Sequence, residues 1–165
     1  MNKTQSIDKP TVLNWLEEVM DPEIPVLSLI DLGVITKVDV SPDNHVTVEM
    51  TPTFAGCPAM DYMKEEVEQT LEKYGITSYS VNMSFDRPWD SNKISEKGKA
   101  ALKKFGLAPP PKYDGVIELD ILEQVDCPYC DSNDTELKTP FGPTLCRSMH
   151  YCNNCKQAFE QFKPV

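Results

Sequence analysis

The residues best suited to chemistry are four cysteines in the C-terminal third of the 165-residue chain. They form two Cys-x-x-Cys pairs, Cys127/Cys130 and Cys152/Cys155, which twenty-one residues separate. Each pair can place two thiolates on one ion, and two pairs complete a tetrahedral shell. The spacing therefore predicts a metal site, with structural zinc as the first interpretation. Iron or an iron–sulfur cluster is an alternative, and so is a pair of disulfides, which a reducing compartment disfavours.

Two further residues near the second pair, Cys146 and His150, could each replace one of its members as a ligand. The other interpretation of Cys146 is a small buried side chain. Four thiolates leave no open coordination position, so a zinc ion bound by them would not activate water. Its expected role is to hold together a unit that is too small to bury a sufficient core.

The sixth cysteine, Cys57, stands between Gly56 and Pro58, just before a predicted helix. A helix N-terminus carries partial positive charge, which favours a thiolate, and a glycine allows a ligand to approach closely. The pattern fits a reactive or metal-binding cysteine and, equally, a buried and inert one. Cys57 is therefore the second candidate site.

Polar residues of two neighbouring loops could line such a site. Asp21, Glu23 and Asp31 lie in a proline-containing loop, where carboxylates either bind metal or, the favoured interpretation, cap backbone N–H groups. Thr51 and Thr53 follow the predicted second strand and lead into the next turn.

Several classes of function are disfavoured by what the chain contains. With two histidines, His45 and His150, it has no Ser/His/Asp set and no di-iron ligand set of carboxylates and histidines at helical spacing. Phosphate-loop and dinucleotide motifs are absent, which argues against a kinase or a dehydrogenase. A net charge of −10 disfavours nucleic-acid binding. A polar start and the lack of a long apolar run predict a cytoplasmic protein without a membrane segment.

The elements that must position these residues follow from apolar periodicity and turn residues. The spacing predicts helices at 8–20 and 60–74, a β-hairpin formed by 34–40 and 46–50, and a further strand at 76–85. The order helix, hairpin, helix, strand is typical of a small mixed α+β domain, which we place at 8–85.

The segment 86–112 differs from its surroundings because it carries seven basic and three acidic side chains. It holds a short predicted helix at 95–105 and the proline triplet 109–111, which favours a stiff linker. This basic connector could dock on an acidic partner, or its charges could form a solvated helix face, as charge runs usually do. The remainder, 113–165, is the predicted zinc ribbon.

Several motifs are similar to those of known families. Asp21-Pro22-Glu23-Ile24-Pro25 and Gly56-Cys57-Pro58 resemble the motifs of the iron–sulfur assembly domain typified by SufT. The connector and the ribbon, together with the two cysteine pairs, resemble the PaaD-like family in three further segments: 94–98, 105–110 and 141–146. The resemblance extends over nearly the whole chain.

The resemblance implies an accessory or maturation factor rather than an enzyme. PaaD-like proteins accompany the multicomponent phenylacetyl-CoA epoxidase of phenylacetate degradation, and its oxygenase and reductase components would be the partners. Cys57 would bind iron or a cluster transiently, in a pocket lined by four residues: Asp21, Glu23, Thr51 and Thr53.

Three hypotheses follow. The first is a maturation factor that delivers iron or a cluster through Cys57. The second is a non-catalytic component that docks on the oxygenase complex through the basic connector and the ribbon. The third, a thiol oxidoreductase that uses a Cys-x-x-Cys pair, is the weakest, because metallated thiolates are not free for exchange. No residue pattern in the chain specifies an oligomeric state.

Overall fold

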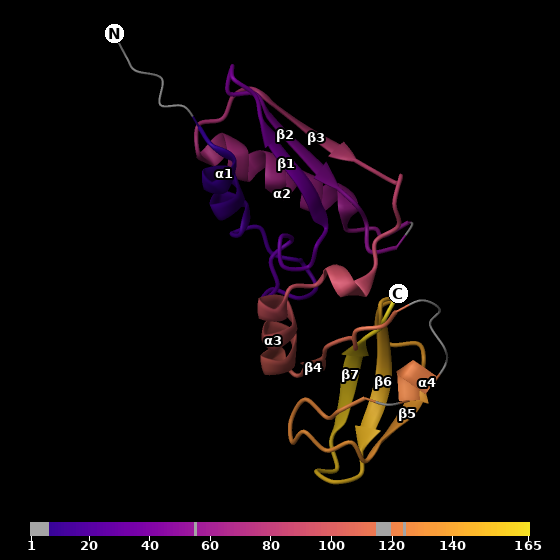
Figure 1. The fold of residues 1–165 in the computed structure, drawn as a ribbon. Coiled ribbons are helices and arrows are strands. Elements are labelled where there is room, and N and C mark those ends of the chain that lie inside the picture. Colours follow the sequence, from indigo (N-terminus) through magenta and orange to yellow (C-terminus); the bar gives the residue numbers. More distant parts are fainter. Residues whose placement is uncertain (1–6, 55, 115–119, 124) are drawn as a thin grey trace. The chain divides into compact units, whose positions relative to one another are not determined.

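The computed structural model describes residues 7–54, 56–114, 120–123 and 125–165. The chain divides into two compact units, Met1–Trp89 and Asp90–Val165 (Figure 1). No helix in the described part is long and apolar enough to cross a bilayer.

The first unit is built on a three-stranded sheet in the order β1-β2-β3. β1 (Ile35–Val40) and β2 (Val46–Met50) form the predicted antiparallel hairpin, and β3 (Tyr79–Met83) runs parallel to β2. Because neighbouring parallel strands need a crossover, α2 (Met60–Lys73) connects β2 to β3. The third strand is shorter than the predicted 76–85, since Ile76 N–H instead donates to Leu71 O near the end of α2.

Two helices supply the apolar face that covers this sheet. In α2, Met60, Met63, Val67 and Leu71 are buried, as their spacing by three and four predicted. Gly75, with a φ of 81°, ends that helix, because its left-handed backbone is one that glycine adopts without strain.

The helix α1 (Lys9–Leu16) is shorter than the predicted 8–20. Asp8 caps its N-terminus by accepting a hydrogen bond from Thr11 N–H at 3.0 Å. After Leu16 the chain forms a turn, in which Val19 N–H donates to Leu16 O, and Val19 remains buried. The apolar period continues through the turn, so periodicity alone did not mark the end of the helix.

The second unit is built on a four-stranded sheet in the order β4-β7-β6-β5 (Figure 1). Its strands are β4 (Leu107–Ala108), β5 (Thr135–Thr139), β6 (Arg147–Cys152) and β7 (Ala158–Phe162). The last three form an antiparallel meander, and β4 pairs with β7 in parallel. A single helical turn, α4 (Asp120–Glu123), precedes the meander.

Residues of the basic connector form part of this second unit. After the short 3-10 helix η1 (Ser91–Lys93), Ser95 caps α3 (Glu96–Phe105) by accepting a hydrogen bond from Gly98 N–H at 2.9 Å. β4 follows directly, and pairing stops at the proline triplet, since proline has no N–H to donate. The chain is thus the predicted α+β fold, with clustered cysteines in a C-terminal ribbon.

Candidate functional site

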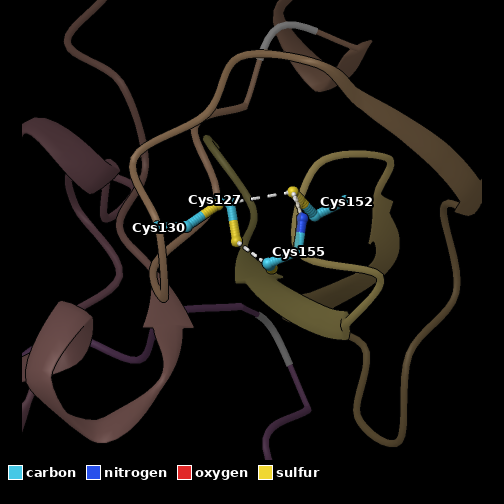
Figure 2. A group of neighbouring side chains, drawn as sticks. All are labelled: Cys127, Cys130, Cys152 and Cys155. Carbon is cyan, nitrogen blue, oxygen red and sulfur yellow. Dashed lines mark hydrogen bonds between the residues drawn. The ribbon is translucent and has the colours of Figure 1, made fainter.

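The four cysteines of the two Cys-x-x-Cys pairs converge on one point (Figure 2). Their sulfur atoms all lie within 4.8 Å of one another. Cys127 Sγ and Cys155 Sγ are 3.6 Å apart, and so are Cys130 Sγ and Cys152 Sγ. A tetrahedral zinc–thiolate shell with bonds of about 2.3 Å has sulfur–sulfur edges of about 3.8 Å. The donor set and its dimensions therefore fit a four-coordinate metal ion.

Each pair sits in a tight backbone turn, called a knuckle here, and the two knuckles repeat the same hydrogen bonds. In the first, Asp131 N–H donates to Cys127 O, and Cys127 N–H donates to Ser132 O. In the second, Lys156 N–H donates to Cys152 O, and Cys152 N–H donates to Gln157 O.

The residue after the second cysteine of each knuckle, Asp131 or Lys156, has a left-handed backbone with a φ of 58° or 61°. This conformation turns the chain sharply back under the cysteines. Most residues with a side chain adopt it only at a cost, so the two turns are held by the structure around them.

The first cysteine of each knuckle, Cys127 or Cys152, is fully buried, and the second, Cys130 or Cys155, is half-buried. Asn154 Nδ2 donates to Cys130 Sγ at 3.5 Å and, with a backbone N–H, lowers the pKa of Cys130 to about 6. Burial raises the pKa of Cys127. Cys130 is thus the thiol of the cluster whose surroundings most favour the thiolate, the form that binds a metal ion.

The two possible substitute ligands lie in other surroundings. Cys146 Sγ is 3.0 Å from Thr144 Oγ1, in the loop before β6. His150 is fully buried, with Nε2 2.9 Å from Ser148 Oγ and its ring stacked on Phe159. Neither belongs to the group of four sulfurs.

Cys57 lies in the loop between β2 and α2. It is half-buried, and its N–H donates to Phe54 O at 3.3 Å. The helix begins at Met60, so Pro58 belongs to the turn that precedes α2. Gly56 is exposed and has a φ of 86°, and among the described residues other than its chain neighbours no atom lies within 4 Å of the position that a Cβ would take.

The residues expected to line this loop have structural roles of their own. Asp21 Oδ1 accepts hydrogen bonds from the N–H groups of Glu23 at 2.8 Å and Ile24 at 2.9 Å, which is backbone capping. Thr51 is buried and donates its N–H to Val34 O at 2.8 Å. Glu23 is exposed, and Thr53 is half-buried.

The buried carboxylate of Asp31 accepts a hydrogen bond from Ser28 Oγ at 3.1 Å, and Ser28 Oγ in turn accepts from Asp31 N–H.

Within the described residues, the ribbon cysteines are the one group of three or more metal-binding side chains that lie together. Cys57 belongs to no such group there.

Several lysines of the basic connector have partners inside the second unit. Lys103 pairs with Asp131, the residue that follows the first knuckle. Lys112 Nζ lies 2.9 Å from Glu96 Oε1, and the side chain of Lys99 is 11% exposed. Three of the seven basic side chains of the connector thus have a carboxylate partner within the second unit, and Lys103 and Lys112 remain exposed to solvent.

Comparison with known families identifies both halves of the chain. Residues 9–78 match the model of the iron-sulfur cluster assembly protein family, and residues 116–163 match that of the PaaD zinc beta ribbon domain. The fold and these two matches therefore define a two-part protein, in which an iron–sulfur assembly domain precedes a zinc beta ribbon domain.

Relatives of known name narrow this class. The chain is 31% identical over 168 residues, the whole of both chains, to an Escherichia coli protein provisionally named as one of the subunits of 1,2-phenylacetyl-CoA epoxidase. It is 38% identical over 92 residues to an Fe-S protein maturation auxiliary factor of Porphyromonas gingivalis, covering 55% of this chain and 87% of the relative. The chain belongs to the PaaD-like family.

One solved structure has a fold similar to that of part of this chain. The crystal structure of a domain of unknown function, DUF59, from Bacillus anthracis is similar with a TM-score of 0.54 and 27% sequence identity. The match covers 57% of this chain and 90% of the other.

Proposed function

We propose that this protein is an accessory factor that helps to assemble the iron–sulfur or di-iron centres of a phenylacetyl-CoA epoxidase and does not itself catalyse epoxidation. One observation carries the proposal: a single chain joins an iron–sulfur assembly domain to a PaaD ribbon. That combination extends over the full length of the relative named for the epoxidase. The oxygenase and reductase components of that system are the proposed recipients.

The ribbon cluster is proposed to hold zinc in a structural role. Four thiolates at tetrahedral spacing satisfy the coordination of the ion and leave no position for a substrate. Zinc binding of about 10–16 kcal/mol in apparent free energy would also be folding energy for this unit. The described core of the unit includes two of the ligands themselves, Cys127 and Cys152.

Cys57 is proposed to bind iron or a cluster during transfer. A carrier must release its cargo, which a single thiolate permits better than a chelating set of four. The half-buried thiol and the open backbone at Gly56 leave room for ligands from a donor or a recipient protein. Glu23, Thr51 and Thr53 would then shape the loop around the cargo, while Asp21 holds the backbone of its own loop.

The test is a Cys57→Ser variant, produced with the epoxidase components and purified without oxygen. We expect zinc at one ion per chain in both wild type and variant, because the ribbon is untouched. We expect the variant chain to lose any bound iron, and the oxygenase or reductase component made beside it to contain several-fold less iron.

A Cys146→Ser variant is the matched control, because Cys146 is also a half-buried cysteine outside the four-sulfur group, and a serine hydroxyl can keep its contact with Thr144 Oγ1. It should support full iron loading. Full iron loading of the oxygenase and reductase components produced with Cys57→Ser would show that Cys57 has no part in the transfer of iron or a cluster.

A further inference from the structure

The loop between β5 and β6, residues 140–146, presents two large apolar side chains to solvent. Phe141 is 71% exposed and Leu145 is 64% exposed. Both fractions are high for side chains that each lose about 1.5–3 kcal/mol of favourable transfer free energy by remaining in water. We call this segment the apolar loop.

The apolar loop is held in place by hydrogen bonds across its base. Gly142 N–H donates to Arg147 O at 2.9 Å, and Arg147 N–H donates to Thr144 O at 3.1 Å. A Cβ at Gly142 would lie 3.0 Å from the backbone of Arg147, so the close crossing requires glycine. Phe141 is fixed from the other side, where its N–H donates to Thr139 Oγ1 at 3.1 Å.

The chain just beyond β7 holds the loop as well. Lys163 N–H, just beyond β7, donates to Cys146 O at 2.9 Å, and Lys163 Nζ donates to Pro140 O at 3.3 Å. The same ammonium lies 5.9 Å from the centre of the Phe141 ring. The exposed side chains are therefore presented on a fixed backbone, which lowers the entropy lost when a partner binds them.

The charge around the apolar loop differs from that of the whole protein, whose net charge is −10. Two nearby cations, Lys138 and Arg147, pair with Glu136 and Glu160. Lys163 adds a further cation beside the loop. A second copy of this chain, or an anionic membrane, would be repelled by the net negative charge. An apolar cleft with carboxylates at its rim, on a different protein, is complementary to the loop.

We propose that the apolar loop is the docking site for the client metalloprotein, and that Phe141 and Leu145 enter an apolar cleft of that client. This inference rests on the proposed function, because it takes an epoxidase component as the client. It assigns docking to the tip of the ribbon hairpin rather than to the basic connector, and it leaves cargo binding to Cys57. Centrally buried aromatic residues usually dominate the affinity of such interfaces.

The experiment measures the affinity of the zinc-loaded protein for the purified oxygenase component and, separately, for the reductase component, by calorimetry. We expect at least tenfold weaker binding to the client after Phe141→Ala combined with Leu145→Ala, and a smaller loss for each single change. Zinc content and circular dichroism should match the wild type, since both side chains are exposed.

Phe85→Ala is the matched control, because Phe85 is 69% exposed but lies in the first unit. It should bind as the wild type does. Unchanged affinity of the double variant would overturn the docking role of the loop alone, and so would a failure of the wild type to bind either component. Light scattering that shows a dimer of the wild type and a monomer of the double variant would instead assign the loop to self-association. The maturation role is tested separately, by measuring the iron content of the epoxidase components produced together with the Cys57→Ser variant. That result does not depend on any of these three outcomes.

Discussion

At the scale of single residues, the metal centre depends on two backbone positions that are not ligands. Asp131 and Lys156 each follow the second cysteine of a knuckle and each have a positive φ. Asp131 also pairs with Lys103 of α3, whereas Lys156 is exposed. Lys156 is therefore the position at which the cost of the left-handed backbone can be measured separately from a side-chain contact.

Replacing Lys156 by glycine is expected to stabilise the second unit by about 1 kcal/mol, because a left-handed residue with a Cβ costs roughly 1–2 kcal/mol and glycine does not. Part of that gain is offset by the greater freedom of glycine in the unfolded chain. The measurement is urea unfolding of the cobalt-substituted protein, followed by the cobalt–thiolate absorption.

The control for this variant is Lys156→Ala, which removes the charge and keeps the Cβ. It should unfold at the same urea concentration as the wild type. Equal unfolding midpoints for the glycine and alanine variants would show that the backbone at this position is not strained.

The sequence was informative about which cysteines cluster and less so about the residues that position them. The spacing of the four cysteines predicted a cluster, because two such pairs have few other uses inside a cell. The left-handed residues carried no signal, since lysine is rare at positive φ. Asn154, which donates to Cys130, also had no motif, because its role depends on a contact between the two knuckles.

At the scale of elements, α3 depends on its N-terminal cap. Ser95 Oγ accepts from Gly98 N–H at 2.9 Å, and Gly98 lies inside the helix, where it lowers helix propensity. β4 begins directly after this helix and pairs with β7, so loss of the first turn should also weaken that end of the sheet.

Removing the cap with Ser95→Ala is expected to lower the free energy of unfolding of the second unit by about 1 kcal/mol. Ser95→Asp should retain the stability, because its carboxylate accepts the same hydrogen bond and favours the positive end of the helix. Both variants are compared by urea unfolding with the cobalt–thiolate signal. A stability of Ser95→Ala equal to that of Ser95→Asp would show that the cap contributes nothing.

Long elements with a clear period were predicted well, and short or interrupted ones less so. The bounds of α2 were predicted to within one residue, whereas α1 was extended through a turn that buries the same apolar positions. The two-residue strand β4 could not be found from the sequence, because its pairing with residues 160–161 is a long-range contact.

The charges of α3 illustrate the same limit. The sequence identified a basic segment, but it did not identify the partners of its lysines. Lys103 pairs with Asp131, twenty-eight positions away in the chain.

At the scale of the whole molecule, the two compact units have different sources of stability. The first buries an apolar core between two helices and a sheet, with Leu16, Val48 and Leu71 all inaccessible to solvent. The second is a small ribbon that includes the four-sulfur cluster. Both tryptophans of the chain, Trp15 and Trp89, belong to the first unit, so their fluorescence reports on that unit alone.

Removal of the metal with a strong chelator is therefore expected to unfold the second unit and leave the first folded. A loss of about 10–16 kcal/mol of apparent zinc-binding free energy exceeds or equals the typical total stability of about 5–15 kcal/mol for a domain. Far-ultraviolet circular dichroism should lose its contribution from the ribbon strands. The thermal transition seen by tryptophan fluorescence should shift by no more than a few degrees.

Addition of zinc after removal of the chelator is the control, and it should restore the circular dichroism spectrum. A spectrum unchanged by chelation would mean that the ribbon folds without metal. A collapse of the tryptophan transition would mean that the first unit depends on the second.

The unequal burial of the two cysteines in each knuckle gives the metal centre a covered side and an accessible side. Cys127 and Cys152 lie in the core, and Cys130 and Cys155 lie near the surface. An incoming ion, a competing chelator or an oxidant must therefore approach along the edge formed by Cys130 and Cys155. Asn154, which is exposed and bonded to Cys130, lies on this accessible side.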